Sequence, residues 1–188
     1  YEIGVRLVGS EMCIRDRDRI LGRVFRNEGA IVVLVGESRV EFGGSEYLKV
    51  MHQLVLGRPP IVNLAREHAL QKLVVAAAND GIIESAHDCS EGGLAVALAE
   101  LCMQNGVGFK YEAGIEGRWD WAVFGEIQSR IIVSMRPENF DSFRNVCADT
   151  GVPWIVIGRT TGDSLVIPNM MDVKVEELKD VWMQGLSG

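Results

Sequence analysis

Apolar residues along this chain occur either in short continuous runs or at helical spacing, and the two patterns alternate. The continuous runs predict strands at 31–35, 107–111, 130–135, 154–158 and 165–167. Turn and capping signals place helices after 45, after 63, at 94–102, after 137 and at 175–183. Strand pairs and helices therefore mix along the sequence, which favours an α+β layered domain over a doubly wound parallel sheet.

Two of these helices are expected to supply much of the core. Asn63 caps the first, whose apolar stripe comprises Leu70, Leu73, Val74, Ala77 and Ala78. The second, at 94–102, is apolar nearly all round. We therefore expect it to be covered by neighbouring elements on several sides.

Residues 86–99 form the most informative segment, because a polar cluster with two glycines runs directly into the second of these helices. The residues before it predict a turn and a short strand, so the cluster lies between a strand end and a helix N-terminus. Unpaired N–H groups and the helix dipole favour anions there, and glycines let a phosphate approach the backbone. The candidate ligand-binding residues are Asp88, Ser90, Gly92 and Gly93. Alternatively, Asp88 or Ser90 caps the helix and the glycines allow close packing.

A second polar cluster precedes the strand predicted at 130–135. Glu126, Gln128 and Arg130 contribute an acid, an amide and a guanidinium. They could form a hydrogen-bonding wall for a polar ligand. The alternative is a solvated loop with an ion pair between Glu126 and Arg130, which contributes little at a surface.

A further pair of glycines lies nearer the beginning of the chain. Gly43 and Gly44 can adopt positive φ, and Ser45 can cap the helix that follows. These three residues are candidates for binding a cofactor. A simple capped turn is the alternative interpretation.

Composition narrows the classes of function. The chain has 188 residues, of which 47% are hydrophobic and 24% charged, enough for a core in one or two domains. The formal net charge of −7 and the lack of a basic run with interleaved aromatics argue against a nucleic-acid partner. A bound phosphate would be held locally, by backbone amides, a metal ion or a partner domain. No stretch reaches about 18 consecutive apolar residues, so we expect a soluble, cytoplasmic protein without a membrane partner.

The four cysteines show no metal-binding or disulfide pattern. Cys13, Cys89, Cys102 and Cys147 have no C-x-x-C spacing. Cys102 and Cys147 lie on apolar helix faces and are expected to be buried thiols in a reducing compartment. Cys89 could be exposed beside the loop glycines, with His87 as its nearest base. Nothing else in the sequence supports acyl chemistry, so we expect no catalytic dyad there.

The chain is expected to divide into three parts. Residues 1–17 resemble translated sequencing-adapter read-through, so we treat them as a non-native, poorly ordered tail. The two prolines that follow Arg58 interrupt helical structure. We therefore predict a boundary there, between residues 18–57 and a domain at 58–188.

Several of these segments, taken in order, carry a resemblance to one enzyme family. They are FGGSEYLK, GRPP, LQKL, SAHDCSEGGLAVALAE, FGEIQSRIIVS and GVPWIVIG. In this order and spacing they resemble the C-terminal part of the synthetase subunits of phosphoribosylformylglycinamidine synthases. The resemblance covers about residues 20 to 184. It places the chain in the superfamily of aminoimidazole ribonucleotide synthetase and implies the α+β fold of that C-terminal domain.

The resemblance implies a ligase of de novo purine synthesis. Such an enzyme uses ATP, magnesium and glutamine-derived ammonia to convert the formamide of formylglycinamide ribonucleotide into an amidine. Its chain contains two related units, each with an N-terminal and a C-terminal domain. Residues 18–57 would end the second N-terminal, ATP-binding-type domain, and 58–188 would form the second C-terminal domain. The implied partners are the missing N-terminal part, a glutaminase subunit and a small bridging subunit.

The resemblance also implies roles for individual residues. Asp88 becomes a candidate magnesium ligand, and Gly92 and Gly93 become candidates for a phosphate loop. Glu126 and Gln128 become polar contacts to a ligand.

Two positions depart from the family pattern, and both limit what the resemblance implies. Ile127 stands where serine is usual and removes a hydroxyl, and Phe42 stands where leucine is usual. In the family only one of two equivalent sites is catalytic, and its histidine belongs to the missing N-terminal unit. We therefore expect these residues to line the silent site, no catalytic residue in this chain, and an inactive isolated fragment.

Two alternatives remain open. The chain could be a structural, docking module of that enzyme with no essential ligand. It could also come from another ATP-using member of the superfamily, such as a thiamine phosphate kinase or a selenophosphate synthetase.

Overall fold

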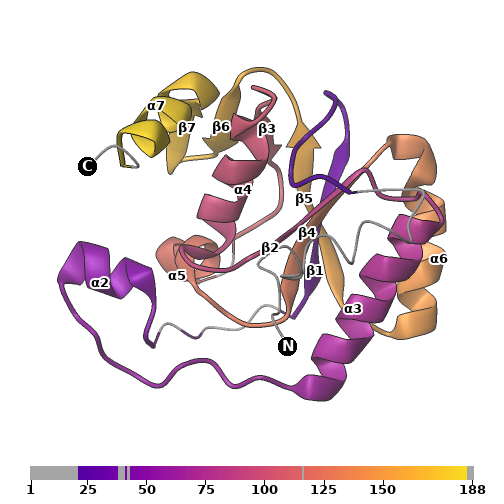
Figure 1. The fold of residues 1–188 in the computed structure, drawn as a ribbon, viewed down its shortest axis with the longest axis horizontal. Coiled ribbons are helices and arrows are strands. Elements are labelled where there is room, and N and C mark those ends of the chain that lie inside the picture. Colours follow the sequence, from indigo (N-terminus) through magenta and orange to yellow (C-terminus); the bar gives the residue numbers. More distant parts are fainter. Residues whose placement is uncertain (1–20, 38–40, 42, 116, 186–188) are drawn as a thin grey trace, which may run out of the picture.

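The computed structural model describes residues 21–37, 41, 43–115 and 117–185; the predicted tail at 1–17 and Phe42 lie outside the described residues. The described strands form one mixed sheet in the order β2-β4-β1-β5-β3-β6-β7 (Figure 1). The strands are β1 (Ile31–Gly36), β2 (Ser85–Asp88), β3 (Phe109–Tyr111), β4 (Arg130–Met135), β5 (Trp154–Thr160), β6 (Ser164–Ile167) and β7 (Met171–Lys174). Neighbouring strands are antiparallel except β3 and β6, which are parallel.

Helices cover both faces of the sheet. They are α2 (Glu46–His52), α3 (Leu64–Asn79), α4 (Gly93–Met103), α5 (Trp119–Phe124), the 3-10 helix η2 (Pro137–Asn139), α6 (Phe140–Thr150) and α7 (Val175–Gly185). The helices α3 and α6 pack together on one face, while α4 lies against α5 and α7 on the other (Figure 1). The predicted α+β layered architecture with a mixed sheet is confirmed.

Strand β1 shows why its sequence is continuously apolar. Val32 and Leu34 belong to the core under α4, whereas Ile31, Val33 and Val35 belong to the core under α3 and α6. Successive side chains of a strand point to opposite faces, so a strand covered on both sides needs apolar residues at every position.

The helices follow the predicted signals. The Asn63 side chain accepts hydrogen bonds from the backbone N–H groups of Ala65 and Arg66, which caps α3. Most of the predicted stripe of α3 is buried, namely Leu70, Leu73, Ala77 and Ala78. Helix α4 is buried on several sides, as its uniform apolarity predicts. No helix among the described residues is long and apolar enough to cross a membrane.

The predicted boundary at Arg58 needs correction. Strand β1 precedes it, yet β1 pairs with β4 on one side and β5 on the other. Residues 31–36 are therefore the middle of the same sheet that residues 58–188 complete. The prolines after Arg58 lie instead in an exposed excursion between α2 and α3 (Figure 1).

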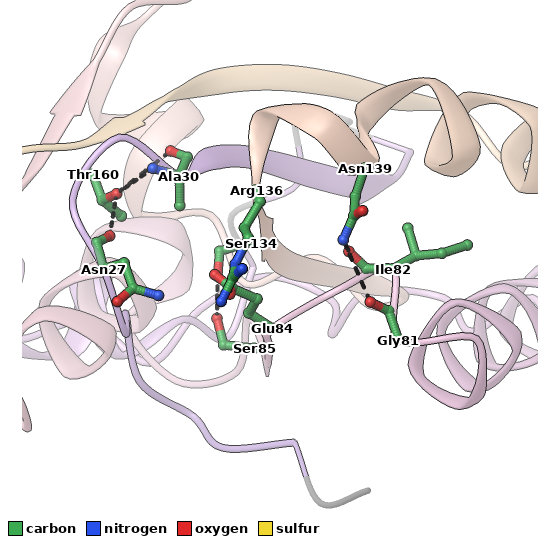
Figure 2. A network of polar contacts seen from close by, with 10 residues as sticks. All are labelled: Asn27, Ala30, Gly81, Ile82, Glu84, Ser85, Ser134, Arg136, Asn139 and Thr160. Atoms are coloured by element: carbon green, nitrogen blue, oxygen red, sulfur yellow. Dashed lines mark hydrogen bonds and ion pairs between the residues drawn. The ribbon is translucent and has the colours of Figure 1, made fainter.

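Buried polar contacts fix the end of the sheet where β1 begins. The Thr160 hydroxyl accepts a hydrogen bond from the Ala30 N–H at 2.8 Å and donates to the Asn27 carbonyl at 2.7 Å. Two hydroxyls, of Ser85 and Ser134, meet at 2.6 Å between β2 and β4. Figure 2 shows these groups, with the ion pair of Glu84 and Arg136 and the Asn139 amide beside them. This network stabilises one end of the sheet. The glycine-rich loop after β2 and the loop before β4 lie at the other end.

Candidate functional site

The predicted glycine-rich loop joins β2 to α4 at the opposite end of the sheet. Asp88 ends β2, and Gly92 is the N-cap of α4 with φ 76°. A side chain at Gly92 would be strained by this φ, and its Cβ would lie 2.3 Å from Val96 Cγ2. In the described part of the chain, the N-cap of α4 makes no side-chain cap hydrogen bond. The alternative in which Asp88 or Ser90 caps this helix is therefore wrong.

A carboxylate from another part of the chain lies at this helix N-terminus. Glu126 Oε1 accepts hydrogen bonds from the backbone N–H of Gly92 and from that of Glu46, both at 2.8 Å. These amides begin α4 and α2 respectively. A negative group is favoured at a helix N-terminus, and a charge-assisted hydrogen bond strengthens each contact. The glycine-rich loop, the Gly43–Ser45 turn and the 124–130 loop thus converge on one side chain.

Glu126 and Arg130 do not form the ion pair considered for this loop, because each side chain contacts other groups. The Arg130 side chain turns into the protein, where the residue is 3% exposed, and its Nη2 donates to the Gly125 carbonyl oxygen. Its Nε has no hydrogen-bond partner among the described residues. Burial lowers the pKa of this guanidinium. The buried Arg130 side chain therefore holds the 124–130 loop through the Gly125 carbonyl.

Asp88 and Ser90 face solvent on the outer side of the glycine-rich loop. The Ser90 hydroxyl donates to Asp88 Oδ2, and this hydrogen bond is the main cause of a lowered pKa for the Asp88 carboxyl. Asp88 Oδ1 lies 3.6 Å from His87 Nδ1. Among the described residues, no three histidine, cysteine or acidic side chains gather as a metal site.

The other predicted glycines serve close backbone packing. Gly93 lies against the 124–130 loop, where an added Cβ would be 2.6 Å from the Gly125 carbonyl oxygen. An added Cβ on Gly43 would be 2.3 Å from the Arg58 carbonyl oxygen. Ser45 caps α2 by accepting a hydrogen bond from the Leu48 N–H at 3.4 Å. The predicted Ser45 cap is confirmed, and the role of residues 43–45 in binding a cofactor stays a prediction.

Gln128 lies away from the carboxylate contact, beside a cavity of about 480 Å³. Ile127 is buried and also lines this cavity, where it places an alkyl group at the position of the usual hydroxyl. The adjacent Ser129 donates to Glu67 Oε2 at 2.6 Å, which links this loop to α3. The structure therefore brings Glu126 to the glycine-rich loop and places Gln128 elsewhere.

Cys89 and His87 have structural surroundings. Cys89, which could have been exposed beside the loop glycines, is buried, and burial raises the pKa of its thiol to about 11. His87 is also buried, and its Nε2 lies 2.7 Å from Glu100 Oε2 on α4. This link between β2 and α4 was not predicted, because the two residues share no local motif. Neither residue is available as a nucleophile and base.

Comparison with known proteins decides the family. The family model of the AIR synthase related protein, C-terminal domain, matches residues 27–168. The chain belongs to this family. Since the matched residues begin before β1, the AIR synthase related domain includes β1, in agreement with the sheet.

Curated relatives of this AIR synthase related domain are much longer proteins. The phosphoribosylformylglycinamidine synthase subunit PurL of Anaeromyxobacter sp. (strain K) is 41% identical over 95% of this chain. The subunit of the same name from Moorella thermoacetica is 40% identical over 96% of this chain. In both cases the chain spans 25% of the relative.

Solved structures share the fold at low sequence identity. Phosphoribosylformylglycinamidine synthase II from Thermotoga maritima has a TM-score of 0.69 and 17% identity, covering 87% of this chain and 28% of that one. T. maritima PurL complexed with FGAR has a TM-score of 0.70 and 16% identity, covering 85% and 29% respectively. The T. maritima protein was also solved with ATP, with ADP and as PurLQS. These likenesses agree with the AIR synthase related fold.

Proposed function

We propose that the chain is part of the ATP-dependent ligase that converts formylglycinamide ribonucleotide to the formylglycinamidine ribonucleotide in de novo purine synthesis. The supporting observation is 41% identity to a PurL subunit over 95% of the chain. Because the chain spans 25% of that relative, the activity is proposed for the whole enzyme. The cytoplasm is the proposed location, and a glutaminase subunit with a small bridging subunit are the proposed partners.

The chemistry is activation of an amide oxygen. ATP phosphorylates the formamide oxygen to an iminophosphate, and ammonia then displaces phosphate to leave the amidine. Such a reaction needs aligned donors and exclusion of water. This chain is proposed to support ligand binding only, with Asp88 as a ligand of the magnesium ion, Ser90 as a contact at the glycine-rich loop and Gln128 as a further polar contact. No step is assigned to a metal held by this chain.

We place this chain at the non-catalytic nucleotide region of the enzyme. The supporting observation is the Glu126 carboxylate, which accepts the Gly92 N–H that a phosphate would otherwise use. A chain that supplies its own anion at this position leaves less room for a transferable phosphate. A nucleotide would then contact the outer side of the loop, near Asp88 and Ser90.

The same observation favours a second candidate function. Glu126 joins the starts of α2 and α4, and Gly93 packs on the 124–130 loop, so this end of the domain is cross-linked without a ligand. The chain would then be a structural module that braces the enzyme and binds nothing essential.

The complete enzyme distinguishes these functions. Formation of the amidine from formylglycinamide ribonucleotide, ATP and ammonia tests the ligase itself, and absence of product with a folded enzyme would refute it. Asp88→Asn and Ser90→Ala then test ligand binding, with the exposed Glu91→Gln as the matched control in the same loop. A binding role requires less co-purifying nucleotide in the two variants than in the control. Unchanged nucleotide content with unchanged stability favours the structural module.

A further inference from the structure

A small cavity lies between α4 and α7, on the face of the sheet that these two helices cover. Met103 ends α4, and Trp182 and Met183 belong to the last turn of α7; all three line the cavity. Figure 1 shows α7 beside α4 at the edge of the domain. The described residues that line the cavity include none from the glycine-rich loop or the 124–130 loop. The cavity is therefore separate from the candidate site described above.

The size of the cavity restricts its ligand. The volume is about 240 Å³, the space of about eight water molecules at roughly 30 Å³ each. Pockets for drug-sized ligands usually measure about 300–1,000 Å³. The cavity therefore suits a molecule with one ring or two fused rings, and it is too small for a nucleotide.

The walls of the cavity favour an aromatic ring. The Trp182 side chain is large and apolar, yet the residue is 46% exposed. An exposed indole can stack on a planar ring, and the sulfur atoms of Met103 and Met183 can make favourable contacts with ring edges. A flat aromatic group is therefore the ligand group that these walls recognise best.

The floor of the cavity consists of side chains that already bind each other. His87 Nε2 lies 2.7 Å from Glu100 Oε2, and His87 Nδ1 lies 2.7 Å from the Asp88 carbonyl oxygen. Both ring nitrogens of His87 thus have oxygen partners within the chain, and the Glu100 carboxylate is held by the imidazole. A charged group on a ligand therefore has to bind at the rim of the cavity.

The rim carries two positive charges. Arg23 and Lys179 line the cavity, and both residues are exposed. In the described part of the chain, neither side chain makes a hydrogen bond or an ion pair, and Arg23 acts on Asp88 only through space. Other cations of this acidic chain have acidic partners, among them Arg66, Arg118, Arg136, Arg144 and Lys174. Two cations without such partners beside a stacking surface favour an anion that carries a ring.

We propose that this cavity binds a small planar aromatic carboxylate. The ring lies against Trp182, and the carboxylate binds at Arg23 and Lys179. This inference goes beyond the function proposed above, which assigns no ligand to these residues. It rests on that function only for the identity of the complete enzyme used in the test.

Methyl NMR of the complete enzyme, labelled with ¹³C at the methionine methyl groups, tests the proposal. Indole-3-acetate is the probe, and indole-3-acetamide, with the same ring and no charge, is its control. The methyl signals of Met103 and Met183 should shift with the acid and saturate, while Met51, 63% exposed on α2, should not respond. The amide should bind about tenfold more weakly than the acid, because it cannot pair with the two cations.

Substitutions separate the charges from the ring contact. Arg23→Gln and Lys179→Gln should each weaken binding of the acid by about threefold and leave binding of the amide unchanged. Trp182→Leu should weaken binding of both probes by about tenfold, since both stack on the indole. Lys72→Gln, which removes an exposed lysine from α3, is the matched control and should change neither affinity.

Four outcomes would overturn the proposal. They are an absence of shifts at Met103 and Met183, equal shifts at Met51, equal affinities for the acid and the amide, and affinity for the acid that both cation variants retain. The methyl signals require no turnover. An inactive enzyme that binds the acid would refute the proposed function alone, and an active enzyme whose methyl signals stay in place would refute this site alone.

Discussion

The carboxylate of Glu126 links the first turns of two helices, and its removal should loosen both. Glu126→Ala leaves the N–H groups of Gly92 and Glu46 without their partner. Glu126→Gln keeps an oxygen at the same place but removes the charge. The two substitutions therefore separate the loss of charge from the loss of the acceptor.

The structure sets the size of the effect. Both hydrogen bonds measure 2.8 Å and join an ionised acceptor to a helix N-terminus. A hydrogen bond to a charged group contributes about 1.5–3 kcal/mol, and the lower end applies because Glu126 is only half-buried. The alanine variant should therefore lose about 3 kcal/mol across the two helix starts. The glutamine variant retains neutral bonds of about 1 kcal/mol each, so its loss should be about 1 kcal/mol.

Amide hydrogen exchange of the complete enzyme, followed by mass spectrometry, measures these losses locally. Each segment loses one of the two hydrogen bonds, and 1.4 kcal/mol corresponds to about tenfold in an equilibrium constant, so Glu126→Gln should speed exchange at 45–48 and at 91–95 by about twofold each. Glu126→Ala should speed exchange by about tenfold in each segment. Glu91→Gln, which changes an exposed carboxylate in the same loop, should leave both segments unchanged.

Two results would refute this reasoning. Exchange in Glu126→Ala that stays within about threefold of the parent would show that the carboxylate does not hold these amides. Acceleration at only one of the two segments would show that Glu126 does not bridge α2 and α4.

Three further outcomes are expected. Gly93→Ala should lower the free energy of unfolding by about 2–4 kcal/mol, because the added Cβ meets a backbone carbonyl oxygen at 2.6 Å. Gly44→Ala, at a residue with positive φ but open space around it, should lower it by about 1 kcal/mol. Pulse proteolysis in urea compares the two variants, and equal losses contradict the packing argument. Cys89 should resist iodoacetamide at pH 8 in the folded enzyme, since its thiol has a pKa of about 11, and should react after unfolding. Ser90→Ala should raise the pKa of Asp88, seen by NMR titration. Because folding lowers that pKa, the parent's extra stability is present above the unfolded-state pKa and is lost as the pH falls through the folded-state value.

Much of the architecture could be predicted because its signals are local. Three elements were predicted with bounds within a few residues of those observed: β1 and β4 from their continuous apolar runs, and α4 from its uniform apolarity. Two elements were missed. Strand β7 alternates half-buried and exposed positions over only four residues, and α5 has only six residues.

The arrangement of the candidate site could not be predicted in the same way. Glu126 is 34 residues from Gly92 and 80 residues from Glu46, and only the folded sheet brings them together. The prolines after Arg58 gave a wrong boundary for a related reason. Proline interrupts regular structure equally in a linker and in an excursion within one domain, and sequence spacing does not distinguish them.

The central position of β1 has a consequence for synthesis of the chain on the ribosome. Ile31 pairs with Met135 on one side and with Arg159 on the other, so β1 emerges long before either neighbour exists. Non-local pairing of this kind slows folding. An apolar strand with two open edges is prone to aggregate until its neighbouring strands are synthesised and pair with it. A nascent chain that ends before residue 130 therefore leaves both edges of β1 unpaired. The interval between synthesis of β1 and synthesis of β4 is when these edges can pair with another chain.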